Sequence, residues 1–317
     1  MTKRIAKLIG DRLHRAGPPL ADLAPGRIGP ALAAKLTRTL GLERAERDRL
    51  VVFEPAVAPL IRPLIDTADV APWHVAATGR WIIAVPAAQA ADLAQRHPNL
   101  ARQLAALPAP ATFADATQPW WALPGGAEQP AAPPRIIVAG QHVAWDETRA
   151  LVGGPATVVA GAEPYWLALL ASTLGRLLLA EGEVAHFPIP DAPDPARASL
   201  AGLALSAANL AAQRAALEQA VIRRLVADFG PPGVPPGPRL RRWWELSFAE
   251  LVAAINAELR NDLPPRYRPT WAEIHADQQA THAEASARLV EIEQAIDAQV
   301  ATLFGLSAAE AQALAAG

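Results

Sequence analysis

The clearest pattern of apolar and polar positions lies near the end of the chain, in residues 291–314, EIEQAIDAQVATLFGLSAAEAQAL. Here and just before, apolar residues recur three or four positions apart, which places them on one side of a helix. They are Leu289, Ile292, Ile296, Val300 and Leu303. Gly305 is a typical helix stop, and Ser307 with Glu310 has the spacing of a capping box. We therefore predict a helix with a buried stripe, a turn and a second short helix.

Shorter apolar runs, bounded by proline and glycine, lie between about residues 50 and 190. Residues 80–86 (RWIIAVP), 133–140 (PPRIIVAG) and 156–161 (ATVVAG) have the length and β-branched content of strands. The stretch AAQAADLAQRHPNLARQLAAL has helical spacing with a break at His97-Pro98. Residues 163–183 (EPYWLALLASTLGRLLLAEGE) are so apolar that they predict a buried helix.

The pattern changes after HFPIPDAPDP, residues 186–195. A long alanine- and leucine-rich helix is predicted over 199–229, followed by a proline-rich loop, PPGVPPGP, and a second helical block. The fold class expected from these patterns is a mixed α/β (α+β) domain followed by a C-terminal helical region. We expect a helical connector over residues 1–50, the α/β domain over 51–195 and a helical extension over 196–317.

Composition narrows the class of protein. Hydrophobic residues make up 51% of the 317, but charges and prolines interrupt every long apolar run, so no membrane span is expected. The first residues, MTKRIAKLIGDRLHR, lack the apolar core of a secretory signal, and the chain has no cysteine, which excludes disulfides and thiolate metal sites. A cytoplasmic protein is expected.

Charge is distributed unevenly along the chain, although the net charge is only −2. Residues 1–50 carry eleven Lys and Arg against five Asp and Glu, a surplus of +6, and residues 269–317 carry one Arg against seven acids, a surplus of −6. This separation suits a polyanion bound at one end, and solvated helix faces explain it equally well.

Known catalytic patterns are missing from the sequence. It contains no G-x-G-x-x-G, P-loop, H-E-x-x-H or G-x-S-x-G motif. The seven histidines show no close ligand pairing, and His275 and His282 lie seven apart on a predicted solvated face, so no metal site is expected. The three lysines all lie within the first 35 residues, which leaves a nuclease centre of the acid–acid–lysine kind without its lysine elsewhere. No catalytic group can be nominated.

The densest cluster of arginine and aromatic residues is PRLRRWWEL. Its guanidinium groups can pair with phosphates and its indoles can stack on bases; the residues are Arg239, Arg241, Arg242, Trp243 and Trp244. The alternative is that both tryptophans pack the new helix against the α/β block while the arginines reach water. A weaker candidate is the turn after RIIVA, where Gln141 and His142 could approach base edges.

Taken in order, several segments resemble the C-terminal target-recognition region of adenine-specific DNA methyltransferases of the fused restriction–modification type, the TaqI-like specificity domain and its larger relatives. The matching segments are GPPLADLAPGRIGPALAAKL, EPAVAPLIRPLIDTADVAPWHVAATGRWIIAVP, RHPNLARQLAAL, WWALPGG, PPRIIVAG, YWLALLASTLGRLLLA, FPIP and EIEQAIDAQVATLFGLSAAE. Together they extend over nearly the whole chain.

The resemblance implies a module that binds double-stranded DNA. Basic residues in or next to the matching segments would contact phosphates, and we expect this of Arg27 (beside Gly26), Lys35, Arg38 and Arg135. The family's glycine-rich S-adenosylmethionine loop and Asn-Pro-Pro-Tyr motif are absent, and its usual glycine motif is degraded here to GRIGPAL. We therefore expect a separately encoded methyltransferase or restriction–modification chain to hold S-adenosylmethionine and the flipped adenine. The alternative is a protein-interaction or regulatory remnant with weak or no DNA binding.

Overall fold

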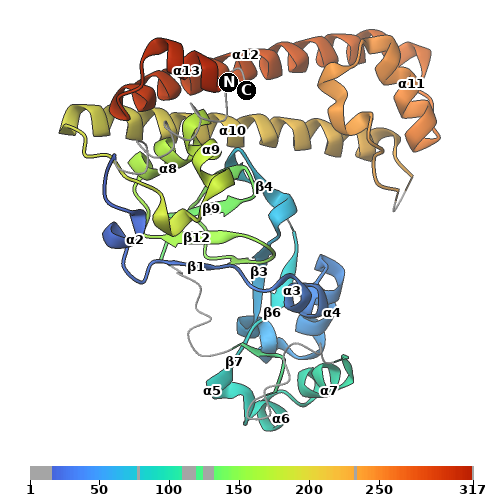
Figure 1. Cartoon of the computed structure of the whole chain (residues 1–317). Helices are drawn as coiled ribbons and strands as arrows, with labels where there is room; N and C mark the ends of the chain where they lie inside the picture. The colour runs from blue at the N-terminus through green and yellow to red at the C-terminus, as the bar shows by residue number, and fades with distance from the viewer. Residues whose placement is uncertain (1–15, 77–78, 109–118, 124–131, 232–233, 316–317) are drawn as a thin grey trace. The chain divides into compact units, whose positions relative to one another are not determined.

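The computed structural model describes residues 16–76, 79–108, 119–123, 132–231 and 234–315. The basic stretch 1–15 and the glycines after Pro124 lie outside these residues. Contacts divide the chain into two compact units, one comprising residues 1–204 with 296–317 and the other residues 205–295. Sheets fill the N-terminal half and helices the C-terminal half (Figure 1), which confirms the mixed α/β class with a helical C-terminal region.

The larger sheet of the first unit has six strands in the order β1-β12-β9-β10-β5-β4. Its strands are β1 (Ile28–Pro30), β4 (Val70–Ala71), β5 (Trp73–Val75), β9 (Arg135–Ala139), β10 (His142–Asp146) and β12 (Thr157–Ala160). Strands β9 and β10 form an antiparallel hairpin whose turn contains Gly140 at a φ of 58°, a conformation that glycine adopts without strain. The predicted strands in RIIVA and TVVA are confirmed.

A second, four-stranded sheet has the order β11-β3-β6-β2. Its strands are β2 (Gly41–Leu42), β3 (Ile61–Ile65), β6 (Trp81–Ile83) and β11 (Leu151–Val152). Around it lie α3 (Ala34–Leu40), α4 (Arg44–Phe53), η1 (Pro55–Leu60), the β7–β8 pair (Val85–Pro86, Ala122–Leu123), α5 (Ala87–Ala90), α6 (Leu93–Arg96) and α7 (Pro98–Ala106). One apolar core, which includes Leu40, Leu64, Ile82 and Leu100, holds this part together.

The two faces of the six-stranded sheet are covered differently. Ile137, Ala139, Ala144 and Val158 form a core with residues of β3 and β4 on one face, and α8 (Pro164–Ala171) contacts β10. The predicted helix 163–183 is divided at Ser172, which is extended and caps α9 (Thr173–Glu181) by accepting a hydrogen bond from the Gly175 amide. Shorter elements are α2 (Leu20–Leu23), η2 (Thr67–Asp69) and η4 (Val184–His186).

The second unit is built on parts of two long helices, α10 (Asp194–Phe229) and α12 (Arg268–Leu303). Between them in sequence lie η5 (Leu240–Glu245), α11 (Phe248–Leu259) and η6 (Pro265–Tyr267). The core of this unit gathers Leu225, Phe229, Trp243, Ile255 and Trp271. No helix in the described part of the chain has both the length and the apolar character needed to cross a bilayer.

The closing helices agree with the pattern that predicts them. Leu289, Ile296 and Val300 are buried, Ile292 and Leu303 are half-buried. Gly305 has a φ of 65°, and Ser307 and Glu310 form the capping box that begins α13 (Ala308–Ala315). Contacts assign residues 296–317 to the first unit. The expected boundaries at residues 50 and 195 stay predictions.

Candidate nucleic-acid interface

The β9–β10 turn presents two of the expected DNA-contacting residues at the surface. Gln141 and His142 are both exposed. The Nδ1 atom of His142 lies 3.0 Å from the carbonyl oxygen of Val70, so one ring nitrogen is already used inside the protein. Gln141 offers an amide whose donor and acceptor suit an adenine edge, and it is the better placed of the two to read a base.

Arg135 does not lie at the surface, and its expected contact with DNA is corrected. Its side chain is 1% exposed and pairs with Asp146, which is equally buried. Arg135 donates from Nε to Asp146 Oδ2 over 2.9 Å and from Nη2 to the same carboxylate and to the Ala150 carbonyl. An arginine enclosed in this way cannot reach a phosphate without breaking a buried ion pair.

The sequence contains a signal for this pair. Arg135 lies five residues before Gly140, and Asp146 lies five residues after Gln141. In a hairpin with Gly140 and Gln141 in the turn, residues at equal distances from the turn face each other, and the structure pairs Arg135 with Asp146 in this register. The charge of Arg135 therefore pairs with Asp146 across the β9–β10 hairpin and stabilises it.

Arg27 is half-buried and also makes contacts within the fold. It donates to the carbonyl of Gly161 over 2.9 Å and to that of Leu23 over 2.7 Å. Its guanidinium carbon lies 5.2 Å from the ring centroid of Trp166, within the range of a cation–π contact. These contacts join the loop before β1 to the end of β12, and a phosphate contact by Arg27 stays a prediction.

Lys35 and Arg38 on α3 are better placed for a phosphate. Both are exposed, three residues apart on one helix, while Leu36 and Leu40 from the same helix are buried in the core. Among the described residues, no carboxylate lies within 4.0 Å of either cation. Two neighbouring cations that no acid neutralises are suited to a phosphate backbone.

In the second unit, the RLRRWW cluster is only partly available to a ligand. Arg239, Arg241 and Arg242 are exposed, with Arg242 3.4 Å from Glu245. Trp243 is fully buried, so its expected stacking on bases is corrected; it packs in the core of its own helical unit, and the alternative is right about burial but not about the α/β block as the packing partner. Trp244 is half-buried and stacks on His282, with ring centroids 4.6 Å apart and an interplanar angle of 18°.

His275 and His282 lie on a buried face of α12, and the prediction of a solvated face is wrong for both. The Nε2 atom of His275 lies 3.3 Å from the Trp243 carbonyl oxygen, and that of His282 lies 3.0 Å from Glu218. Between them, Gln279 donates to the carbonyls of residues 244 and 246. His275, Gln279 and His282 thus hold the Trp243–Trp244 segment against α12. In the sequence these polar residues are spaced like those of a solvated helix face, which is why their burial was not predicted.

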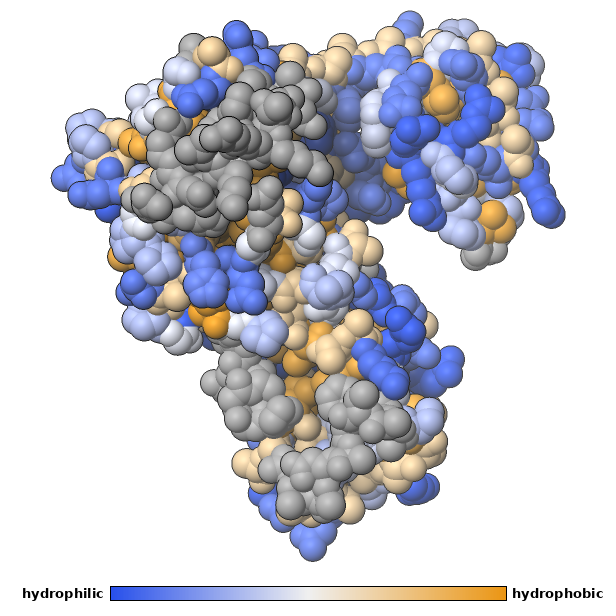
Figure 2. Space-filling model, viewed as in Figure 1, coloured by the Kyte–Doolittle hydropathy of each residue, from blue (hydrophilic) through white to orange (hydrophobic). Residues whose placement is uncertain are grey.

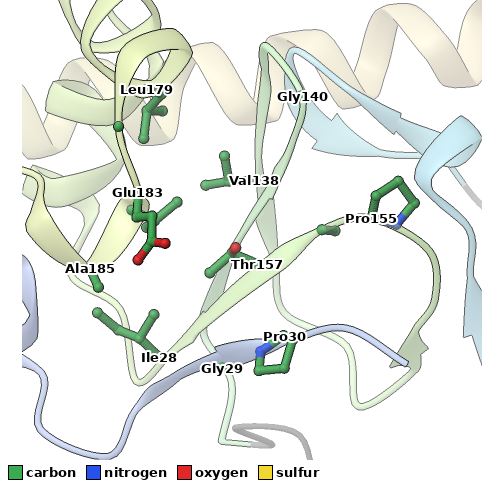
Figure 3. Close-up of a pocket in the computed structure, with 13 residues that line it drawn as sticks. Ile28, Gly29, Pro30, Val138, Gly140, Pro155, Thr157, Leu179, Glu183 and Ala185 are labelled. Atoms are coloured by element: carbon green, nitrogen blue, oxygen red, sulfur yellow. The ribbon is translucent and has the colours of Figure 1, made fainter. Parts of the chain in front are cut away.

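A pocket of about 560 Å³ lies beside the same β9–β10 turn (Figure 3). Ile28, Gly29 and Pro30 of the degraded glycine motif line it together with Gly140. Among its described lining residues the only ionisable side chain is Glu183, which points into the space (Figure 3). A single carboxylate repels a phosphate, so the pocket suits an uncharged or cationic group.

Two features at the surface and inside the first unit are not singled out by the sequence patterns. Val52 and Phe53, at the end of α4, are 78% and 75% exposed. Asp297, within the closing helix, accepts hydrogen bonds from the amide and the hydroxyl of Thr173, at 2.8 and 2.7 Å. The hydrogen bonds between Thr173 and Asp297 join segments 124 residues apart, and the spacing of residues along the chain cannot predict such a contact.

Comparison with known proteins gives matches to a family model and to solved structures. A family model described as a domain of unknown function (DUF8810) matches residues 193–300, which covers α10 to most of α12. No curated protein matches this chain. Among solved structures, the Type IIL restriction-modification enzyme MmeI in complex with DNA is similar over 86% of this chain, with a TM-score of 0.40 and 11% identity. This chain spans about a third, 35%, of that enzyme's chain.

Proposed function

We propose that this chain is a DNA target-recognition module of a restriction–modification or DNA adenine-N6 methylation system. In this role it selects the DNA site for a catalytic partner. The partner holds S-adenosylmethionine, takes the target adenine out of the stack and transfers the methyl group. The chain itself supplies contacts to the duplex.

The contact between Thr173 and Asp297 is the observation that carries this proposal. Thr173 belongs to the YWLALLASTLGRLLLA segment and Asp297 to the EIEQAIDAQV segment, two of the segments that resemble the target-recognition region. One carboxylate binds both the amide and the hydroxyl of Thr173 at the start of α9. Two segments distant in sequence thus form parts of one unit, as expected if the ordered resemblance reflects a common architecture.

The surface of the first unit offers contacts of the two kinds that a DNA-binding module needs. Lys35 and Arg38 present unpaired cations for phosphates, and Gln141 presents an amide for a base edge. In the second unit, Arg239, Arg241 and Arg242 add exposed cations. Phosphate contacts supply affinity, and base contacts supply specificity.

A salt titration of DNA binding tests the proposal. Fluorescence anisotropy with mixed-sequence duplexes, with and without the catalytic partner, is expected to give an affinity that falls steeply with salt, because phosphate contacts release counterions. The double variant K35A/R38A is expected to lower the slope of log K against log salt by about 2, since each lost phosphate contact removes about 0.9.

R102A is the matched control, because Arg102 is an exposed arginine of α7 in the same unit whose guanidinium lies 3.2 Å from Asn99. It is expected to leave the slope unchanged. If the wild-type chain shows no salt-sensitive binding in either condition, the proposed function is wrong.

A second candidate function is a protein-interaction or regulatory role without DNA recognition. It is favoured by the burial of Arg135 and Trp243, which removes two expected contacts, and by the net charge of −2. Under this function the chain binds the catalytic partner with an affinity that does not depend on DNA, and a pull-down with and without nuclease treatment distinguishes the two.

A further inference from the structure

The end of α4 exposes two adjacent apolar side chains. Val52 is 78% and Phe53 75% exposed, the two highest values among the large hydrophobic residues of the described chain. A single exposed apolar residue is common on protein surfaces, but two large neighbours at a helix end, one of them aromatic, indicate a contact surface.

The helical geometry of α4 explains why this pair faces outward. Leu50 and Val51 pack against the core of the four-stranded sheet. Positions three and four residues apart share a helix face, so Val52 and Phe53 fall beside Arg49 on the side that the core does not cover. None of the ten residues of α4 is fully buried.

The exposed pair is held in place by the residue that follows it. The Glu54 amide donates to the Leu50 carbonyl over 2.9 Å and ends α4. The Glu54 carboxylate accepts the Leu100 amide of α7 at 3.3 Å and lies 3.4 Å from Nδ1 of His97. Pro55 then begins η1. Val52 and Phe53 are therefore presented from a fixed backbone, which lowers the entropy lost on binding.

The segment that ends in the exposed pair carries a surplus of positive charge. Helix α3 and helix α4 both contact β2 and lie beside each other (Figure 1). Residues 34–53 carry five cations against three acids, and the surface over these helices is mostly hydrophilic (Figure 2). The cations are Lys35, Arg38, Arg44, Arg47 and Arg49, and the acids are Glu43, Glu46 and Asp48.

The three acids are already engaged. The Glu46 carboxylate accepts the Glu43 amide over 2.8 Å, and Asp48 lies 2.8 Å from Arg47 and 3.8 Å from Arg44. Glu43 lies 3.6 Å from Arg80. Within the described chain no carboxylate lies within 4.0 Å of Arg49, as is also true of Lys35 and Arg38. Residues 34–53 therefore keep a surplus of positive charge, which complements a polyanion.

We propose that Val52 and Phe53 form an apolar wedge that enters DNA at a base step, while Arg49, Lys35 and Arg38 hold the flanking phosphates. This inference rests on the proposed function and names the surface that contacts the duplex. Apolar side chains that insert between bases unstack them and bend the duplex, which brings more protein surface against the phosphates.

The test uses the full-length chain without its catalytic partner, which would itself unstack a base, and duplexes of mixed sequence that carry 2-aminopurine at successive positions. Emission of this base rises when it is unstacked. Binding of the wild-type chain is expected to raise the emission. The variant V52S/F53S is expected to bind about tenfold more weakly, in the range measured for loss of an aromatic–base contact, with an unchanged salt slope and no rise in emission.

Other variants separate the wedge from the charge. F53W, unlike V52S/F53S, is expected to keep both the wild-type affinity and the rise in emission, because a larger aromatic ring fills the same base step. R49A is expected to lower the salt slope by about 0.9 and to keep the emission rise. V290S, which removes a 49% exposed apolar side chain from α12, is the matched control and is expected to behave as the wild type.

The outcomes distinguish this inference from the proposed function. Absence of salt-sensitive binding by the wild type overturns both. Binding by V52S/F53S with wild-type affinity and emission overturns the wedge and leaves the proposed function standing. If V52S/F53S binds DNA normally but no longer binds the catalytic partner, the surface docks protein, and the wedge is equally overturned.

Discussion

At the scale of single residues, burial decides what a charged side chain can do. Arg135 and Arg38 carry the same charge, and the sequence leads us to expect a phosphate contact from both. Arg135 is enclosed with Asp146, whereas Arg38 is exposed on α3. The first stabilises the β9–β10 hairpin, and only the second is available to a phosphate.

A substitution at Arg135 tests this structural role. R135A leaves the Asp146 carboxylate buried and unpaired, and the free energy of unfolding is expected to fall by about 3–5 kcal/mol. The double variant R135L/D146L removes both charges and is expected to recover most of that loss. Urea unfolding followed by circular dichroism measures both. If R135A is as stable as the wild type and loses only DNA binding, the structural role is wrong.

At the scale of the elements, the closing helix depends on a contact that lies outside its own sequence. Asp297 faces the first amide of α9, where a negative charge also interacts favourably with the helix dipole. The apolar residues Ile296 and Val300 of this closing helix are buried, and contacts assign them to the first unit. The end of α12 is therefore part of the α/β unit.

D297A is expected to destabilise this junction by about 1.5–3 kcal/mol, the usual range for hydrogen bonds to a charged group. Hydrogen exchange is expected to rise in α9 and in residues 296–303, with little change in α4. The control E291A removes an exposed acid from the same helix. Equal exchange in D297A and E291A would contradict the assigned role.

At the scale of the whole molecule, the two units are expected to respond differently to acid. Burial lowers the pKa of His275 below its ordinary value of 6.5, and a hydrogen bond to the Trp243 carbonyl opposes that effect only in part. The folded unit therefore favours the neutral form of His275 more than the unfolded chain does. Its contribution to stability is complete above pH 6.5 and is lost as the pH falls below 6.5 towards the lowered pKa, because the unfolded chain then binds more protons.

Hydrogen exchange of residues 205–295 in urea offers a measurement, because it follows the second unit alone, whereas six of the nine tryptophans lie in the first unit. Urea unfolding on the acid side of pH 6.5 is expected to show this unit less stable than at neutral pH. H275Q can still bond to the Trp243 carbonyl and is expected to reduce the dependence on pH. H186Q, at an exposed histidine of the first unit, is the control. An unchanged dependence in H275Q would refute the assignment.

The sequence by itself determined the elements and the fold class. The spacing of apolar residues and the glycines and prolines that bound them predicted the strands in RIIVA and TVVA, the long helix before the PPGVPPGP loop, and the turn at Gly305. Each of these depends on residues close together in the chain. It also kept open the two environments of the tryptophans in RLRRWW, of which Trp243 took the buried one.

Only the tertiary structure decided which polar residues are free. Arg135 and His275 look like surface residues along the chain, yet partners 11 and 32 positions away enclose them. Phe53 looks like a core residue, yet Leu50 and Val51 occupy the core side of α4 and leave it exposed. Whether a residue is buried depends on which distant segments of the chain pack against it, and the spacing of residues along the chain does not predict those contacts.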